Sequence, residues 1–139
     1  MNNLKKGILD IGGVIIAPKC NLEKVILDFG KDNIDIIKLN DITTVIQFLE
    51  FPTIGSKKFA VDITFKNEVL WSVRLMVDDP TIDEWDFWGL QAEHREWLLQ
   101  ELGKSDGVKD EIRYGWGSIS SWWDPRSCTS GITILYSQK

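Results

Sequence analysis

One histidine and two cysteines are the side chains of this sequence best suited to acid–base or nucleophilic chemistry. The histidine, His94, lies in "LQAEHREWLL" between apolar neighbours, and no nucleophile stands near it in the sequence. General acid–base catalysis requires a reacting group within hydrogen-bond reach of the imidazole. A histidine in such a segment is more often exposed on a helix or hydrogen-bonded in the core. The sequence therefore predicts a structural role for His94.

The cysteines, Cys20 and Cys128, form no recognisable metal or disulfide pattern. The sequence has no Cys-x-x-Cys, no His-x-x-x-His and no calcium-binding loop, and two thiols with one imidazole make a poor zinc site. Two cysteines are also too few for a disulfide framework, which favours a reduced, cytoplasmic protein. We interpret both as small, half-buried apolar residues and predict neither a metal nor a cofactor.

Carboxylates are plentiful, and two adjacent pairs, Asp78-Asp79 and Asp83-Glu84, are candidates for acid–base work. A glycosidase-type pair needs two carboxyl groups that face each other across a cleft, and sequence spacing does not show this. The pairs fall at the end of a predicted strand and the start of a predicted helix, where acids commonly serve the structure. The sequence also has no glycine-rich phosphate-binding motif. We predict that the chain is not an enzyme, and an unrecognised carboxylate pair stays open as an alternative.

Three tryptophans, three glycines and one cysteine lie in the stretch "YGWGSISSWWDPRSCTSGITILY", residues 114–136. Exposed tryptophans stack on nucleic-acid bases, but such platforms lie in basic grooves. Here the chain has a formal charge of −5, and the bases near these tryptophans in the sequence are Arg113 and Arg126. This charge argues against a nucleic-acid partner. Two interpretations remain, a hairpin that completes a sheet and a small-ligand or carbohydrate site on Trp122 and Trp123.

Length and composition bound the architecture that positions these residues. A chain of 139 residues with 43% apolar and 27% charged residues is typical of one globular domain, residues 1–139. No apolar run is long enough for a membrane span, and the start "MNNLKKGILDIGG" lacks the pattern of a secretory signal. We therefore expect a single cytoplasmic domain without a membrane segment.

The hydrophobic pattern predicts an α+β fold, a mostly antiparallel sheet with two helices packed on it. The expected order is ββ-α-ββββ-α-ββ, because the connections between strands are too short for parallel crossovers. Gly12-Gly13 predicts the turn of the first hairpin, and Asn21 and Gly30 predict the ends of the first helix. The expected elements are a hairpin over 8–16, a helix over 21–29, strands over 34–39, 43–51, 58–65 and 70–77, a helix from Thr81 to Gly103, and strands over 114–123 and 131–137.

The second helix, in "TIDEWDFWGLQAEHREWLLQELG", is apolar on two sides. Thr81 and Glu84 fit a capping box at its start. One side carries Trp85, Trp88, Ala92, Leu99 and Leu102, and the other carries Phe87, Leu90, Trp97 and Leu98. Such a helix either lies between two layers or shows one side to a partner, and layered burial is the more common case.

Negative charge is concentrated around this helix. Residues 78–111 hold eleven acids and three bases, whereas the rest of the chain has more bases than acids. An acidic surface attracts basic protein partners, chiefly by raising the association rate, and it repels phosphate backbones. The alternative is a solvated helix face that has no partner.

Nearly the whole chain resembles a group of small bacterial cytosolic proteins. The resemblance rests on "GILDIGGVIIAPKCNLEKVILDFG", on the strands that follow, and on "EHREWLLQELG" with the stretch 114–136. Its most specific parts are Trp116-Gly117-Ser118-Ile119-Ser120-Ser121 and Asp124-Pro125, which we expect to be signatures of the fold. Some members of the group resemble immunity proteins of contact-dependent growth inhibition and other polymorphic toxin systems.

The resemblance implies an antitoxin without catalysis of its own. Such a protein binds the C-terminal domain of one cognate toxin, often a basic nuclease, and covers its active site or substrate surface. We expect the binding surface at the acidic start of the second helix and at the tryptophans of the last hairpin. Its predicted residues are Asp78, Asp79, Asp83, Glu84, Trp85, Asp86, Trp88, Trp122 and Trp123. The alternative is a small-ligand or carbohydrate-binding module that uses the tryptophan-rich hairpin.

Overall fold

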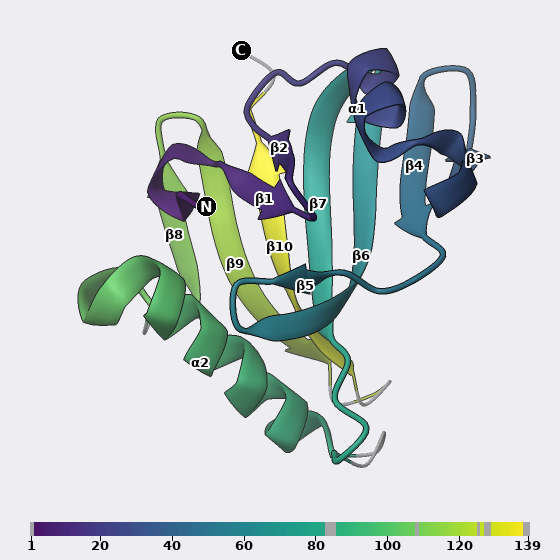
Figure 1. Cartoon of the computed structure of the whole chain (residues 1–139). Coiled ribbons are helices and arrows are strands. Elements are labelled where there is room, and N and C mark those ends of the chain that lie inside the picture. Colours follow the sequence, from purple (N-terminus) through teal and green to yellow (C-terminus); the bar gives the residue numbers. More distant parts are fainter. Residues whose placement is uncertain (1, 83–85, 108, 125, 127–128, 138–139) are drawn as a thin grey trace.

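Antiparallel strands form the centre of the protein. The computed structural model describes residues 2–82, 86–107, 109–124, 126 and 129–137, which are called the described residues below. The main sheet has the strand order β3-β4-β6-β7-β10-β9-β8, with the short β5 paired to β6 (Figure 1). Its strands are β3 (Ile34–Lys38), β4 (Thr43–Phe48), β5 (Thr53–Ile54), β6 (Lys57–Lys66), β7 (Val69–Val77), β8 (Glu111–Tyr114), β9 (Gly117–Asp124) and β10 (Thr129–Tyr136). Neighbouring strands pair antiparallel throughout, which confirms the predicted α+β class.

The N-terminal part follows the sequence prediction closely. β1 (Leu9–Ile11) and β2 (Val14–Ile16) form a hairpin of their own, separate from the main sheet. Its turn is Gly12-Gly13, and both glycines have positive φ, at 60° and 91°. Helix α1 (Leu22–Phe29) begins after Asn21, whose side chain accepts from the Glu23 N–H at 2.9 Å. Two short 3₁₀ helices, η1 (Leu4–Lys6) and η2 (Lys31–Asn33), complete this part.

One face of the main sheet is covered and the other is open. Alternate residues of β6 are buried, namely Phe59, Val61, Ile63 and Phe65. They belong to one core with residues of the β1–β2 hairpin, of α1 and of α2 (Phe87–Asp106). Figure 1 shows these three elements on the same side of the sheet. We call the other face, which no described helix covers, the open face.

The C-terminal part has one strand more than predicted. The segment predicted as a single strand from residue 114 is interrupted by a two-residue turn at Gly115 and Trp116. β8 precedes this turn and β9 follows it, and Tyr114 pairs with Gly117. Apolar alternation does not reveal such a turn, because serines occupy much of the strand that follows.

The second helix begins later than the capping-box pattern predicts. Thr81 donates its hydroxyl and its N–H to Asp79 Oδ1, at 2.6 and 2.9 Å, and so lies in a turn before the helix. α2 begins at Phe87, and Asp86 is the N-cap, accepting from the Gly89 N–H at 3.0 Å. The helical path is broken at Gly103, close to its predicted end. The predicted start at Thr81 is therefore wrong.

Replacing Asp86 by alanine is expected to lower the free energy of unfolding by about 1 kcal/mol, because the Gly89 N–H then loses its acceptor. Asp86→Asn keeps an amide oxygen at the same place and is expected to change the free energy by only a few tenths of a kcal/mol. Urea unfolding of the two variants and the wild type measures both values. Equal destabilisation by alanine and asparagine would contradict this capping role and point to the charge instead.

Candidate functional site

His94 lies in the core. Its side chain is 1% exposed, the Val77 N–H donates to Nε2 at 2.9 Å, and Nδ1 lies 3.3 Å from Ser130 Oγ. Because Nε2 accepts, the neutral ring carries its proton on Nδ1, which donates to the serine hydroxyl. Burial, followed by the positive charge of Lys57, lowers the pKa of His94 to about 4. The ring is therefore neutral at pH 7, and its two nitrogens join α2 to β7 and β10.

α2 is fixed to the sheet along one side. The fully buried Trp97 donates its Nε1–H to the Ile54 carbonyl at 2.8 Å and packs edge-on against Phe59, with ring centroids 5.1 Å apart. Lys57 of β6 forms ion pairs with Glu93 and Glu96. Among the helix residues whose burial is described, the buried ones are Gln91, His94, Trp97, Leu98 and Leu102. These contacts hold α2 in a defined position beside the sheet.

The other side of α2 faces solvent, contrary to the expectation of layered burial. Trp88 is 60% exposed, and Ala92, one turn further along, is also exposed. Leu102, predicted to share this side, is instead 2% exposed and part of the core. The helix thus packs on a single layer and presents its first turn outward.

Trp88 and Trp123 join the start of α2 to the end of β9. Their ring centroids are 5.3 Å apart, with the ring planes inclined by 43°. Trp123 is 48% exposed, so the pair forms an aromatic surface patch. Figure 1 shows the end of β7, the start of α2 and the end of β9 at one corner of the molecule. We call this region the acidic tryptophan corner, and its residues are Asp78, Asp79, Asp86, Trp88 and Trp123.

Three of the corner residues are acids, namely Asp78, Asp79 and Asp86. Hydrogen bonds from the Thr81 hydroxyl and N–H hold the pKa of Asp79 below its usual value. Asp78 and Asp86 are exposed and form no ion pair among the described residues. Further along the helix, by contrast, acids are paired with bases, as Glu93 is with Lys57. Asp78 and Asp86 are therefore acids of the corner without an ion-pair partner among the described residues, whereas the charge of Lys57 acts on Asp79.

Three predicted binding residues, Asp83, Glu84 and Trp85, lie outside the described residues.

Trp122 lies on the open face, opposite Trp123. Adjacent strand residues point to opposite faces, and the two tryptophans follow this rule. The Trp122 Nε1–H donates to Thr133 Oγ1 at 3.0 Å, and the Arg74 guanidinium lies 5.1 Å from a Trp122 ring centroid. One small ligand therefore cannot stack on Trp122 and Trp123 together. This corrects the idea of a single platform on both residues.

A hollow of about 520 Å³ lies on the open face, and sequence reasoning did not find it. Its floor consists of the short side chains Val45, Thr64 and Ser72, which are paired in register across β4, β6 and β7. Longer side chains form its rim: Ile37, Leu39, Gln47, Asp62, Lys66, Trp71 and Arg74. A row of short side chains between rows of long ones is the physical reason for the hollow.

Trp71 is the rim residue that the alternating pattern misplaced. Alternation along β7 predicts it on the buried face with Val73 and Leu75, but the register shifts between Thr64 and Phe65 of the paired strand. This β-bulge leaves Trp71 without a partner on β6 and turns it to the open face. The Lys66 Nζ lies 3.6 Å from a Trp71 ring centroid. No feature of the sequence alone signals the bulge.

No group of three His, Cys, Asp or Glu side chains among the described residues is placed to hold a metal ion. Within the same residues, no helix is long and apolar enough to cross a membrane. Comparison with known proteins found no matching family model, curated protein or solved structure.

Proposed function

We propose that this chain is a cytoplasmic immunity protein that neutralises a cognate toxin domain by binding a basic surface through the acidic tryptophan corner. The observation that carries the proposal is the exposed Trp88–Trp123 pair beside Asp78 and Asp86, which form no ion pair among the described residues. Tryptophans that lose water on binding are favoured interface anchors, and surrounding charge raises the association rate. The resemblance of the sequence to immunity proteins supports the same function.

A nuclease domain is the kind of toxin that this surface fits. Nucleases bind a phosphate backbone and carry basic surfaces for that purpose. The corner offers Asp78 and Asp86 as unpaired acids, and Asp79 as an acid whose pKa is lowered. Occupation of the basic surface by these carboxylates would exclude the nucleic-acid substrate without any chemistry by the immunity protein.

The first test is to isolate the partner and measure its inhibition. The tagged protein is used to recover bound proteins from its native cells, and the recovered toxin domain is then purified separately. The proposal predicts a complex of defined stoichiometry, loss of nuclease activity in that complex and protection of cells that co-express both proteins. A tight complex that leaves the partner's activity intact would contradict the neutralising role.

Trp88→Ala is expected to weaken the complex by about 2 kcal/mol, or roughly thirtyfold in Kd, mainly through faster dissociation. The reason is the loss of an exposed aromatic anchor beside Trp123. Surface plasmon resonance measures both rate constants. Trp71→Ala is the matched control, because Trp71 lies on the open face away from the corner. Equal effects of the two variants would contradict the assignment of the corner.

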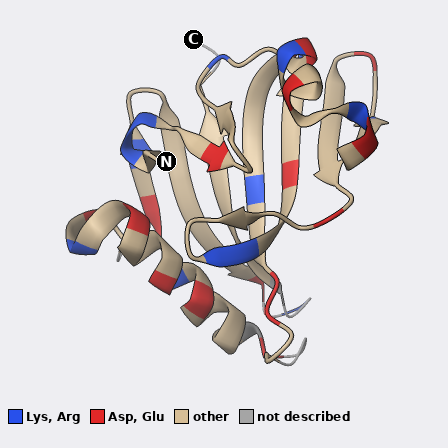
Figure 2. Cartoon of the chain, viewed as in Figure 1, with Lys and Arg blue, Asp and Glu red and all other residues tan. Residues whose placement is uncertain are grey.

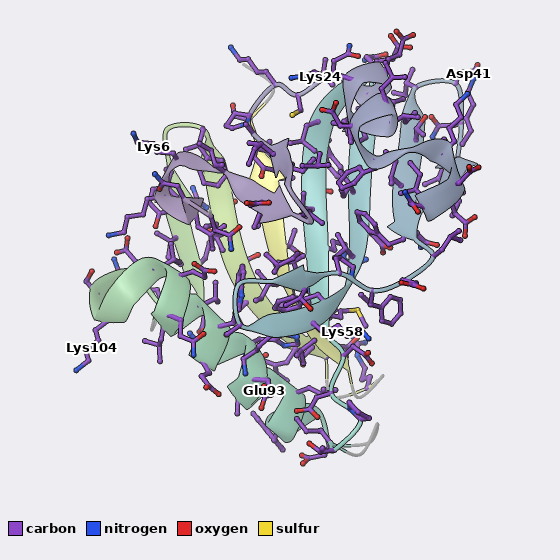
Figure 3. All side chains as sticks on the ribbon, in the orientation of Figure 1. Lys6, Lys24, Asp41, Lys58, Glu93 and Lys104 are labelled. Atoms are coloured by element: carbon purple, nitrogen blue, oxygen red, sulfur yellow. The ribbon has the colours of Figure 1, made fainter. Side chains whose placement is uncertain are left out.

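The charge of the corner is tested with Asp78→Asn combined with Asp86→Asn. Asparagine keeps the cap of α2, so the variant changes charge while the helix start is preserved. Association at low salt is expected to slow by about threefold to tenfold, and added salt should abolish the difference. Asp28→Asn with Asp41→Asn is the control, since both residues are exposed and Figure 3 shows Asp41 at the other end of the molecule. An equal loss in the control would indicate an effect of net charge alone.

A second candidate function is the binding of a small ligand in the hollow of the open face. The observation in its favour is the mixture of apolar and hydrogen-bonding groups around one concave space, with Trp71 on the rim. A screen of sugars and other small molecules by tryptophan fluorescence tests this function. A saturable response that disappears in Trp71→Phe would support this second function. No response across the screen would contradict it, and toxin binding would then be the remaining candidate.

A further inference from the structure

The two edges of the main sheet are different. At one edge, β8 has four residues and presents exposed charges on Glu111 and Arg113. At the other edge, β3 presents apolar side chains, with Ile36 42% exposed and Ile37 38% exposed. Leu39 and Ile42, just beyond its end, are 63% and 50% exposed. Charges commonly protect an edge strand from pairing with another chain, and the centre of β3 has none.

The outward hydrogen-bonding groups of β3 are fixed by its pairing with β4. The Leu39 N–H donates to the Thr43 carbonyl at 2.9 Å, and the Leu49 N–H donates to the Asn33 carbonyl at 3.2 Å. In an antiparallel pair alternate residues bond to the partner strand. The N–H and C=O groups of Ile34, Ile36 and Lys38 therefore point away from β4, and no described strand pairs with them.

We propose that β3 pairs antiparallel with β3 of a second copy of this chain, so that two main sheets join into one. Ile36 faces Ile36 of the partner on the two-fold axis, and Ile34 faces Lys38 of the partner. This register brings all three outward-facing residues of each strand into hydrogen-bonded pairs. It also keeps Asp35 away from the partner's Asp35 and Lys38 away from the partner's Lys38, so that no like charges face each other.

Charge favours a second copy over a different partner at this edge. Residues 34–39 contain one acid and one base, so the strand has no net charge with which to select an acidic or a basic partner. A two-fold interface between identical strands needs only self-complementarity, and an isoleucine on the axis satisfies it. Figure 2 shows the acids of α2 away from β3, so that two copies can join without bringing their acidic helices together. The acidic tryptophan corner stays accessible in such a dimer.

Analytical ultracentrifugation over a range of protein concentrations tests the dimer. The wild type is expected to shift with concentration from its mass of 15.9 kDa to twice that value. Ile36→Lys and Ile36→Glu should each be monomeric at concentrations where the wild type is dimeric, because like charges then meet on the axis. Equimolar mixing of these two variants should restore the dimer, since a lysine then faces a glutamate. A variant that had merely lost its fold would show no such rescue.

Two further variants separate the edge strand β3 from the open face. Lys38→Pro removes an outward N–H while it spares the bonds to β4, and it should weaken the dimer. Leu135→Lys is the control, because Leu135 is 39% exposed but lies on the central strand β10. This variant should form dimers over the same concentration range as the wild type. A wild type that stays monomeric at all concentrations would overturn the proposal. So would an Ile36→Lys and Ile36→Glu mixture that stays monomeric, or a dimer that Leu135→Lys disrupts.

Discussion

Acidification from pH 7 to pH 4.5 is expected to lower the free energy of unfolding by about 2 kcal/mol more in the wild type than in a His94→Gln variant. His94 is the single histidine of the chain, and its pKa is lowered to about 4 in the folded protein. The cause is burial first and the charge of Lys57 second. Protonation would also force Nε2 to donate where it now accepts from the Val77 N–H.

The direction of the effect follows from where the proton binds. In the unfolded chain the histidine has a pKa of about 6.5, so between that value and about 4 the unfolded state takes up a proton that the folded state refuses. The stability that depends on neutral His94 is complete above pH 6.5 and is lost as the pH falls toward 4. Protonation of carboxylates also destabilises both proteins at low pH. Because it affects the wild type and His94→Gln alike, it cancels in the difference between their free energies of unfolding.

Two measurements check this expectation. Urea unfolding at several pH values gives the free energy of unfolding of the wild type and of the variant. The change of their difference with pH tests the expectation. NMR titration of the folded wild type follows one histidine ring, so the signal needs no assignment among several. A midpoint near 6.5 would contradict the buried, hydrogen-bonded state of the ring.

Local patterns in the sequence were enough to predict most elements of the fold. Gly12-Gly13 predicted a turn that needs positive φ, and Asn21 predicted the cap of α1, since each signal involves residues within a few positions. The start of α2 was missed because an acidic, polar segment offers several possible caps. Thr81 bonds to Asp79 instead, and Asp86 takes the role of the cap.

The geometry of the candidate site depends on contacts between residues that are distant in the sequence, and local sequence patterns do not predict such contacts. The sequence named Trp88 and Trp123 as binding residues, and the structure shows that their rings are in contact. That contact requires the packing of α2 against β9, which distant residues decide. The hollow of the open face was missed for a related reason: a β-bulge beside Thr64 changed the direction of Trp71 and broke the alternation on which the prediction depended.

Gly117→Ala is expected to lower the free energy of unfolding by about 3 kcal/mol or more. A Cβ atom at this position would lie 2.0 Å from the Leu135 carbonyl oxygen, a backbone atom that cannot rotate away. β9 and β10 would have to separate where Gly117 pairs with Tyr136, next to the turn between β8 and β9. Overpacking against backbone therefore disrupts the sheet itself.

The damage would extend to the neighbouring Trp116, which fastens the N-terminal segment to the sheet. Trp116 donates its Nε1–H to the Lys5 carbonyl at 2.8 Å, and its ring lies against Gly7 and beside Tyr136. Gly115→Ala is the matched control, because a Cβ atom there would meet nothing within 4 Å and should change stability by less than about 0.5 kcal/mol. Thermal and urea unfolding of the two variants measure the difference. Similar stability of the two variants would mean that Gly117 has no role in the close approach of β9 to β10. A large difference would indicate that Trp116 and Gly117 serve the fold. They would then support the strand β9, whose other end carries the acidic tryptophan corner.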